Sequence, residues 1–337
     1  MSKEIVTVGG GNGSPVINEA LLLTQKVDKI NAVAAVFDSG GATGRRRLDS
    51  FGREIAYSDA MRNLFSLVSP DKRAAKNYQA LLELFNHRDS RDRVLGQDIF
   101  SRFFDPIKGF SQIEEIIENL GIDLQGHVFP SSTKPTNIAF TTTSGRNFLG
   151  EHLLDEHRMS EDIVINMYLD PSVDAYTPAA DAIANAQVTI LSCGSLHGSV
   201  LSNFLPNGMK EALARSKTKL FLVTNLVSAR NETHNLTPVQ FAEIVEKYSG
   251  KKPDGLIVPE ISRESFESKY PDVSALYNQE HSHFLGWNSQ ELYKAQDKGI
   301  RIITHRATKV VEAENGYKIV RHDPQKLSDA LGTILTA

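Results

Sequence analysis

Short apolar runs alternate with amphipathic segments over most of the chain. Residues 5–8 form an apolar run that ends in glycines, and residues 30–37 form a second run, rich in valine and alanine. The segment 15–23 between them has the pattern of a helix with proline in its first turn. This strand–helix–strand order predicts two parallel strands joined by a right-handed crossover.

Five later runs have the same buried character, and we expect helices between them to begin near Pro178, Gly208 and Pro238. The runs predicted as parallel strands are residues 163–167, 188–191, 220–224, 255–258 and 300–303. Uninterrupted apolar strands separated by helices indicate an α/β fold. We predict a Rossmann-like, doubly wound and mostly parallel sheet that is buried on both faces.

Two regions interrupt this alternation. Residues 58–120 have apolar positions at the helical period, most clearly in 76–85, and we expect a helical cap inserted over residues 58–125. Residues 128–149 have the pattern of a small β-hairpin. We find no repeat and no evident linker, so the sequence predicts a single domain over residues 1–337 that carries the insertion.

Composition and charge narrow the class of protein. Hydrophobic residues make up 40% and charged residues 23%, which excludes collagen-like and disordered chains. The 37 basic and 41 acidic residues give a net charge of −4, so no overall basic field favours nucleic acid. No apolar run approaches the ~20 residues of a membrane-spanning helix. The single cysteine, Cys193, cannot form an intrachain disulfide. We expect a cytoplasmic protein without membrane insertion.

A glycine-rich loop, Gly9-Gly10-Gly11-Asn12-Gly13, joins the first predicted strand to the first predicted helix. Glycines let the backbone approach a ligand closely, and the free N–H groups of a helix N-terminus suit a phosphate. The spacing matches neither a Walker-type loop nor the regular dinucleotide fingerprint, so both of those classes lose support. A tight turn without a ligand is the alternative, but the position at the end of a strand favours binding.

A second polar segment follows the second predicted strand, and we expect it to form a loop that faces the first one. Asp38 could hold Mg²⁺ or a ribose hydroxyl, which makes Mg²⁺ a candidate cofactor. The other candidates offer hydroxyl groups, close backbone approach or positive charge for phosphate: Ser39, Gly40, Gly41, Thr43, Gly44, Arg45 and Arg46. For the arginines, a solvated basic run is the equal alternative.

Three further segments follow predicted strands or open helices. Ser58 and Asp59 are natural N-caps of a helix. Gly194-Ser195 comes after the run 188–191 and suits another phosphate or sugar contact. The segment 223–226 lies past a further strand end.

The cysteine and the histidines have ordinary structural interpretations. We interpret Cys193 as a small buried residue rather than a nucleophile. We expect His197 to face solvent from a helix. His281 and His283 are expected at the surface, because no zinc-site spacing surrounds them.

Taken in order, the motifs resemble one superfamily over essentially the whole chain. Val-Gly-Gly-Gly-x-Gly is followed by Asp-x-Gly-Gly-x-x-Gly-Arg, Asp-x-x-Arg-Asn, Gly-Ser-Leu-x-x-Ser-Val-Leu-x-Asn and Thr-Asn…Glu-Thr. This order is similar to that of the 2-phospho-L-lactate transferases and the bacterial gluconeogenesis factors. The tail that starts at Arg321 resembles the Arg-His-Asp-x-x-Lys-Leu ending of the gluconeogenesis branch. Departures from that branch, such as Asp38-Ser39 in place of two acidic residues, indicate a divergent member.

The resemblance implies a nucleotide diphosphate compound bound between the glycine loops. It implies phosphate contacts from the first loop, a metal or hydroxyl contact from Asp38, and closure of the site by the cap. The ligand-binding residues implied in this way are Gly10, Gly11, Asn12, Gly13, Asp38, Arg62, Asn63, Gly194, Ser195, Leu196, Asn225 and Arg321.

Three functions follow as hypotheses. The first is a cytosolic regulator of carbon metabolism or cell-wall synthesis that binds a nucleotide sugar of the UDP-N-acetylglucosamine type. The second is a Mg²⁺-dependent transferase that moves a phospho-hydroxyacid from a nucleotide diphosphate carrier to a hydroxyl acceptor. The third, an NAD-dependent oxidoreductase, is disfavoured by the glycine spacing. Apolar positions in the segment 103–110 could serve a homo-oligomer interface.

Overall fold

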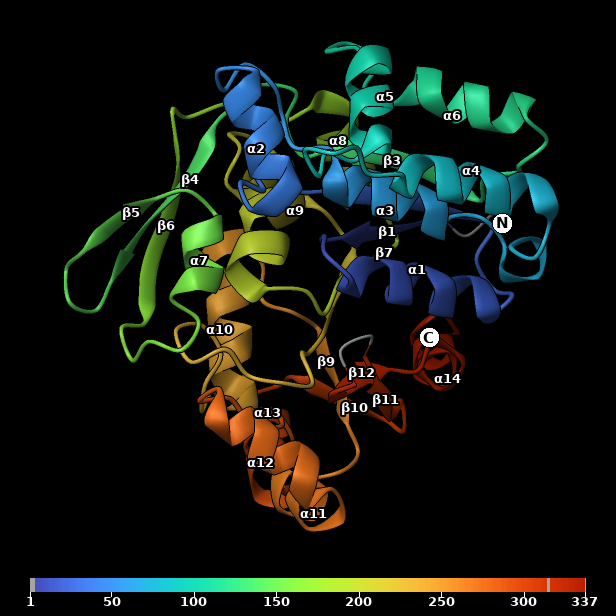
Figure 1. Ribbon diagram of the computed structural model, residues 1–337. Helices are drawn as coiled ribbons and strands as arrows, with labels where there is room; N and C mark the ends of the chain where they lie inside the picture. Colours follow the sequence, from blue (N-terminus) through green and yellow to red (C-terminus); the bar gives the residue numbers. More distant parts are fainter. Residues whose placement is uncertain (1–3, 314–315, 337) are drawn as a thin grey trace.

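Seven parallel strands form the central sheet (Figure 1). The computed structural model describes residues 4–313 and 316–336. In sheet order the strands are β10 (Arg301–His305), β9 (Gly255–Pro259), β8 (Lys219–Val223), β7 (Val188–Leu191), β1 (Glu4–Val8), β2 (Lys29–Ala34) and β3 (Gly126–Pro130). Every neighbouring pair is parallel, which confirms the predicted doubly wound α/β fold.

The strand order reverses between β1 and β7. The chain runs outward from β1 through β2 to β3, then returns to the other side of β1 and continues outward from β7 to β10. At such a reversal the connections leave toward opposite faces, so a crevice opens at the carboxyl ends of the two central strands. The loops after β1 and β7 meet at this crevice, where the N–H of Ser192 donates to the carbonyl of Val8 over 2.9 Å.

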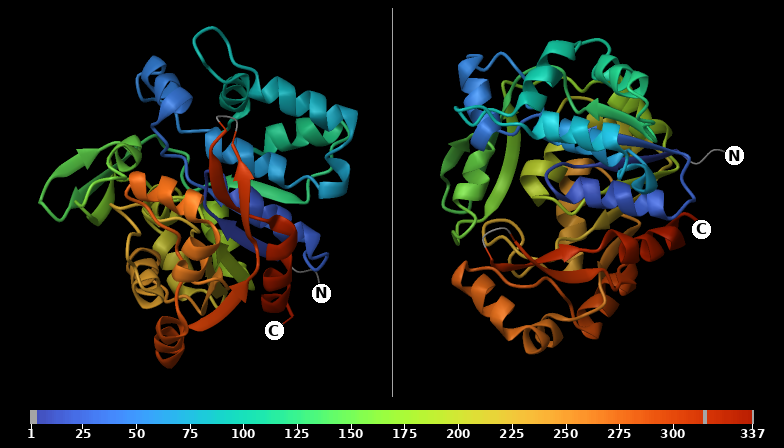
Figure 2. Two further views of the ribbon diagram at one scale, coloured as in Figure 1. Left: turned by 60° about the horizontal axis from the view of Figure 1, so that its bottom comes forward. Right: turned by 45° about the vertical axis from the view of Figure 1, so that its right-hand side comes forward.

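Helices form two layers around the sheet. One group in mutual contact comprises α1 (Gly13–Leu23), α3 (Ser58–Ser66) and α14 (Pro324–Ile334), and Figure 2 shows α14 beside α1. The other comprises α8 (Thr177–Asn185), α9 (Met209–Arg215), α10 (Pro238–Ser249) and α13 (Ser289–Asp297). The starts of α8, α9 and α10 agree with the helix positions predicted from the sequence.

The segment between β2 and β3 is mostly helical, as predicted. After α3 come α4 (Lys76–Asn86), α5 (Leu95–Phe103) and α6 (Ser111–Asn119). A chain of edge-to-face and tilted ring contacts holds these helices together, linking Tyr57, Phe65, Tyr78, Phe85, Phe100, Phe104 and Phe110. Phe110 is therefore a core residue and not part of a free surface, whereas Ile107 in the same stretch is 84% exposed.

A second, three-stranded antiparallel sheet lies to one side of the central sheet (Figure 1). Its strands are β5 (Asn147–Leu149), β4 (Asn137–Thr142) and β6 (Val164–Asp170). The prediction of a parallel strand at 163–167 is wrong, because this segment pairs antiparallel with β4. The predicted hairpin is β4–β5 alone, since residues 126–130 pair with β2 in the central sheet.

The C-terminal part forms a small layer of its own. Helices α11 (Arg263–Lys269) and α12 (Pro271–Gln279) pack beside the hairpin of β11 (Thr308–Glu312) and β12 (Lys318–His322), around a separate apolar cluster that includes Phe266 and Tyr277. In the described part of the chain, no helix is both long and apolar enough to cross a bilayer.

Candidate functional site

Two cavities lie at the carboxyl ends of the central strands, and Asp155 lines both of them. We call the first cavity the C-terminal lobe of the site. It has a volume of about 370 Å³ and is lined by residues that include Asn12, Gly13, Gly194, Ser195, Asn225, Glu232, Tyr277 and Arg321. The cap lobe has a volume of about 520 Å³ and is lined by residues that include Gly11, Asp38, Thr43, Asp59, Arg62, Gln97 and Glu151. Consecutive residues of the glycine loop, Gly11 to Gly13, thus separate the two lobes.

Helix α1 begins at the junction of the lobes. Gly13 lies so close to the loop after β7 that a Cβ there would be 2.6 Å from the N of Gly194. Gly11 has φ of 59°, a conformation that glycine adopts without strain. No side chain caps α1 among the described residues, and its first turn carries no acid. The positive end of the helix therefore faces the junction, which suits a phosphate group.

Asp59 and Asn63 hold this loop from the cap. Oδ1 of Asp59 accepts from the N–H of Gly11 over 2.8 Å and from Nη1 of Arg62 over 3.0 Å. Asn63 is buried and donates to the carbonyl of Gly9. Burial raises the pKa of Asp59 to about 6, although Arg62 opposes that rise. These two residues connect the cap to the backbone that would bind phosphate.

Residues 41–49 form a helix, α2 (Gly41–Asp49), where the sequence predicted a loop. The helical turn of about 100° per residue sends three consecutive arginines in different directions. Arg45 pairs with Asp92, and Arg46 pairs with Glu54 and Asp98. The buried Arg47 donates to backbone carbonyls, including that of Thr136 over 2.6 Å. The arginines fasten α2 to its neighbours, and none of them lines either lobe.

Asp38 lines the cap lobe with both carboxylate oxygens engaged. Oδ1 accepts from the N–H of Gly40 over 2.8 Å, and Oδ2 accepts from Oγ of Ser58 over 2.8 Å. Within residues 4–313 and 316–336, no group of three or more His, Cys, Asp or Glu side chains is placed to hold a metal ion. Asp38 by itself therefore does not build a metal site, and Mg²⁺ would need oxygen ligands from a substrate.

Two acidic residues that the sequence analysis missed stand near Asp38. Glu151 precedes the short helix α7 (His152–Glu156), and Asp155 lies within it. Burial raises the pKa of Glu151 to about 9, and the negative charge of Asp38 adds to this rise. Burial also raises the pKa of Asp155. The acidic stretch after the hairpin was the available signal, but its position gave no hint of Asp38, more than a hundred residues earlier.

In the C-terminal lobe, a carboxylate occupies the start of the short helix after β7. Oγ of Ser195 donates to the carboxylate of Glu232 over 3.0 Å, at the N-terminus of η2 (Leu196–Val200). The N–H groups of Leu196 and His197 also contact Glu232. Asn225 donates to the carbonyl of Gly194 over 2.7 Å. A side chain thus caps this helix, whereas no side chain caps α1 among the described residues.

The pH dependence of stability should reveal Glu232. Burial raises its pKa from 4.5 to about 7, although the hydrogen bond from Ser195 opposes that rise. The folded state then holds the proton more tightly than the unfolded state. Its stabilising contribution is complete below pH 4.5 and is lost as the pH rises through about 7. We expect Glu232→Gln to remove this loss, a difference on the order of 3 kcal/mol between pH 4 and pH 8.

Urea unfolding of both proteins across that pH range checks this prediction. Asp59 and Glu151 also have raised pKa values, but they are present in both proteins, so only the difference between the two curves reports Glu232. Parallel curves would contradict the assignment.

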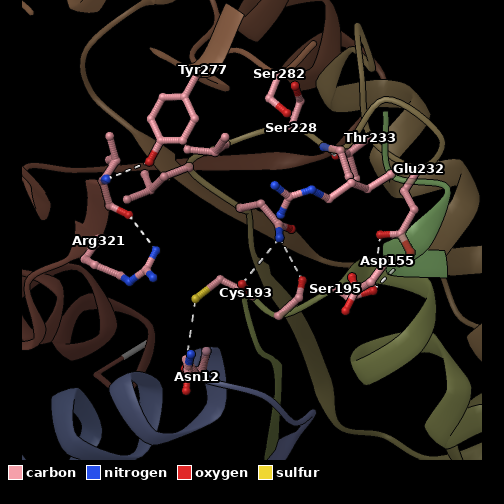
Figure 3. A pocket seen from close by; sticks show the side chains of 18 of the residues that line it. Asn12, Asp155, Cys193, Ser195, Ser228, Glu232, Thr233, Tyr277, Ser282 and Arg321 are labelled. Carbon is pink, nitrogen blue, oxygen red and sulfur yellow. Dashed lines mark hydrogen bonds between the residues drawn. The ribbon is translucent and has the colours of Figure 1, made fainter. Parts of the chain in front are cut away.

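Two arginines line the C-terminal lobe from different elements. Arg321 lies on β12 and extends toward Cys193 (Figure 3), and its Nη1 donates to the carbonyl of Val320 over 3.1 Å. Two residues after Arg321, Asp323 caps α14 by accepting from the N–H groups of Gln325 and Lys326. Arg158 pairs with Glu280 over 2.8 Å across the lobe. The tail motif thus presents one arginine to the cavity and anchors it with a helix cap.

Cys193 lines the C-terminal lobe with a partly buried side chain, and we expect its thiol to be unreactive. Burial raises its pKa to about 12. Because the thiolate is the reactive form, we expect iodoacetamide to label the native protein at pH 8 roughly 10³-fold more slowly than the urea-unfolded protein. Intact-mass spectrometry over time measures both rates, and equal rates would show an activated cysteine.

The histidine expectations are wrong at two positions. His197 is 2% exposed and packs edge-on against Tyr248, so it does not face solvent. Burial lowers its pKa to about 4. His283 is also buried, its ring meets that of His234 edge to face, and burial lowers its pKa to about 3. His197 lies in the five-residue helix η2 and His283 lies in a loop. Neither segment is long enough to show a periodicity that distinguishes an inward from an outward side chain.

The predicted binding residues divide into three groups by position. Those that line the cap lobe are Gly11, Asp38, Gly40, Gly41, Thr43 and Arg62. Those that line the C-terminal lobe are Asn12, Gly13, Gly194, Ser195, Asn225 and Arg321. Those that line neither lobe are Gly10, Ser39, Arg45, Asn63 and Leu196. In this last group Ser39 bonds to His152, and Leu196 is a core residue.

Comparison with known proteins places this geometry in context. A family model described as "2-phospho-L-lactate transferase CofD" matches residues 5–307. A Thermotoga maritima protein named "Putative gluconeogenesis factor" is 26% identical over 98% of this chain and 99% of its own length. A Listeria innocua protein named "Gluconeogenesis factor" is 24% identical over 99% and 98%. The crystal structure of a upf0052 family member from Bacillus halodurans has a TM-score of 0.77 at 24% identity, covering 98% of this chain and 99% of that one.

Proposed function

Because the chain belongs to the 2-phospho-L-lactate transferase CofD family, we propose that it binds a nucleotide sugar of the UDP-N-acetylglucosamine type as a regulator of carbon metabolism or cell-wall synthesis. The names of the Thermotoga maritima and Listeria innocua relatives support the regulatory role. We also propose that the protein is cytoplasmic, since regulation of carbon metabolism takes place there.

The binding proposal rests on the position of the two lobes, which lie on either side of the glycine loop. The start of α1, which no side chain caps, lies at the junction of the lobes. A diphosphate there would accept hydrogen bonds from backbone N–H groups. Arg321 supplies a cation on the C-terminal side. That lobe also offers Leu226, Val227 and Tyr277, apolar surface suited to a base. We therefore assign the nucleoside to the C-terminal lobe and the sugar to the cap lobe.

Isothermal titration against UDP-N-acetylglucosamine tests the proposal. We expect saturable binding with one site per chain. GDP-linked sugars serve as the comparison for the base, and ATP serves as a control for general anion binding. Absence of heat with every UDP- and GDP-linked compound would overturn the proposal.

A transferase of the family's named type is the second candidate, because Asp38 lines the cap lobe beside Gly11. A bound Mg²⁺ would neutralise charge on the transferred phosphoryl group. Asp38 could be one of its carboxylate ligands, together with phosphate oxygens of the substrate. Release of nucleoside monophosphate that requires Mg²⁺ would favour this function, and unchanged turnover in Asp38→Asn would remove Asp38 from it.

A further inference from the structure

The cap lobe has more carboxylates than available cations. Four acidic residues line it: Asp38, Asp59, Glu151 and Asp155. Of the described residues, Arg62 and Arg88 are the arginines that line it, and both already pair with aspartates. Arg62 contacts Asp59 over 3.0 Å, and Arg88 contacts Asp92 over 2.7 Å.

A third arginine lies near this lobe without lining it. Arg47 interacts electrostatically with Asp38 and Glu151, but its side chain donates to the carbonyls of Phe37, Asp38 and Thr136 and to the amide oxygen of Asn137. A carboxylate entering the lobe would therefore meet the carboxylates of Asp38 and Asp59 without an unpaired arginine in position to receive it, and like charges at short range repel each other. Hydroxyl groups would instead find many acceptors.

One acceptor in the lobe has no partner. Gln97 on α5 is 4% exposed, and its Nε2 donates to Oγ1 of Thr43 over 3.2 Å. Its Oε1 is buried without a hydrogen-bond partner among the described residues. Leaving a buried amide oxygen unpaired costs free energy. A ligand hydroxyl that donates to this oxygen would remove that cost and so contribute more binding free energy than the same hydrogen bond would at the exposed surface. This side chain belongs to the lining of the lobe, independently of the acidic cluster.

We propose that the cap lobe is a subsite for an uncharged, hydroxyl-rich group, that it excludes a carboxylate-bearing group, and that Gln97 is a specificity-determining acceptor in it. The inference rests on the proposed function, since the diphosphate must lie at the junction for the attached group to enter this lobe. It also separates the two candidate functions, because a phospho-hydroxyacid carries a carboxylate and a sugar such as N-acetylglucosamine does not.

Three ligands that share one nucleotide test the subsite by calorimetry. UDP lacks the sugar, UDP-N-acetylglucosamine carries a neutral one, and UDP-N-acetylglucosaminuronate carries the same sugar with a carboxylate at C6. We expect the neutral sugar to bind at least tenfold more tightly than UDP, and the uronate no more tightly than UDP. Equal affinities for UDP and the neutral sugar, or tight binding of the uronate, would overturn the inference while leaving nucleotide binding intact. Failure of all three to bind would overturn the proposed function and the inference with it.

A variant then tests Gln97 itself. Gln97→Met keeps the approximate volume and removes the acceptor. We expect it to lose at least fivefold in affinity for UDP-N-acetylglucosamine and to keep its affinity for UDP within twofold. A purely structural role would weaken both ligands together. Gln112→Met, at an exposed position of α6, is the matched control and should change neither affinity. An unchanged sugar affinity in Gln97→Met would remove Gln97 from the proposal, and the three-ligand comparison on the unaltered protein does not depend on the variant's folding.

Discussion

Replacing Gly13 with alanine is expected to abolish measurable binding of the nucleotide ligand, a loss of at least about 100-fold. The added Cβ would be 2.6 Å from the N of Gly194 and 2.7 Å from the carbonyl carbon of Cys193. These are backbone atoms, so the start of α1 and the loop after β7 must separate. Forcing extra volume into a packed site costs about 1–3 kcal/mol of stability, and here it also displaces the N–H groups at the junction.

Titration calorimetry and thermal unfolding of the variant measure the two effects. Gly332→Ala is the matched control, because Gly332 lies inside α14 and a Cβ there would meet the end of Lys26 at an ordinary 3.4 Å. We expect this control to bind normally and to be slightly more stable, since alanine is favoured within helices. If Gly13→Ala binds as tightly as the unaltered protein, the junction is not the phosphate site.

Removing the side chain of Arg321 should weaken nucleotide binding by about 10- to 100-fold. Its guanidinium extends into the C-terminal lobe near Cys193 and donates to the carbonyl of Val320 (Figure 3). A hydrogen bond from a charged donor to phosphate contributes about 1.5–3 kcal/mol, so Arg321→Ala loses that contribution while the fold is kept. Arg321→Lys should recover only part of it, because lysine cannot bind two oxygens in parallel.

The control for Arg321 lies directly across the hairpin. Lys309 on β11 is paired with Arg321 in the strand register and carries the same charge, but it does not line the lobe. Lys309→Ala should leave the dissociation constant within twofold at 0.15 M salt. If both variants weaken binding equally, the effect is a general one of surface charge and not a phosphate contact.

Six of the seven central strands were predictable because they depend on local pattern, whereas β3 was expected in the hairpin. Strands such as β7 and β9 are mostly apolar and are buried at every position, as expected for a sheet covered on both faces. The segment 163–167 shows where that reasoning fails. It is nearly as apolar, yet Ile165 and Tyr168 are half-exposed, because β6 lies in a sheet with one face open to solvent. Hydrophobicity alone does not distinguish a strand buried on two faces from a strand buried on one.

The residues of the candidate site also divide into those that the sequence could indicate and those that it could not. Gly11, Asn12 and Gly13 could be proposed as cavity-lining residues from sequence, because a glycine-rich turn between a strand and a helix commonly lies at the ligand crevice of an α/β sheet. Arg45 looked equally suitable, but as a helical residue it pairs with Asp92 outside both lobes. Glu151 and Gln97 could not be assigned to the site from sequence, since the acidic stretch around Glu151 gives no hint of Asp38 and nothing near Gln97 indicates a cavity.

The sequence by itself determined the parallel α/β framework and the position of the glycine loop at the end of β1, because strand periodicity and backbone freedom are properties of neighbouring residues. Only the tertiary structure decided which side chains converge on that loop. Asp38, Asp59, Gln97 and Glu151 come from separate elements spread over more than a hundred residues, and packing of the cap and the small sheet brings them into one lobe. The charge balance of that lobe, and hence the chemistry of the group it accepts, depends on which arginines are already paired, which is a property of contacts distant in sequence.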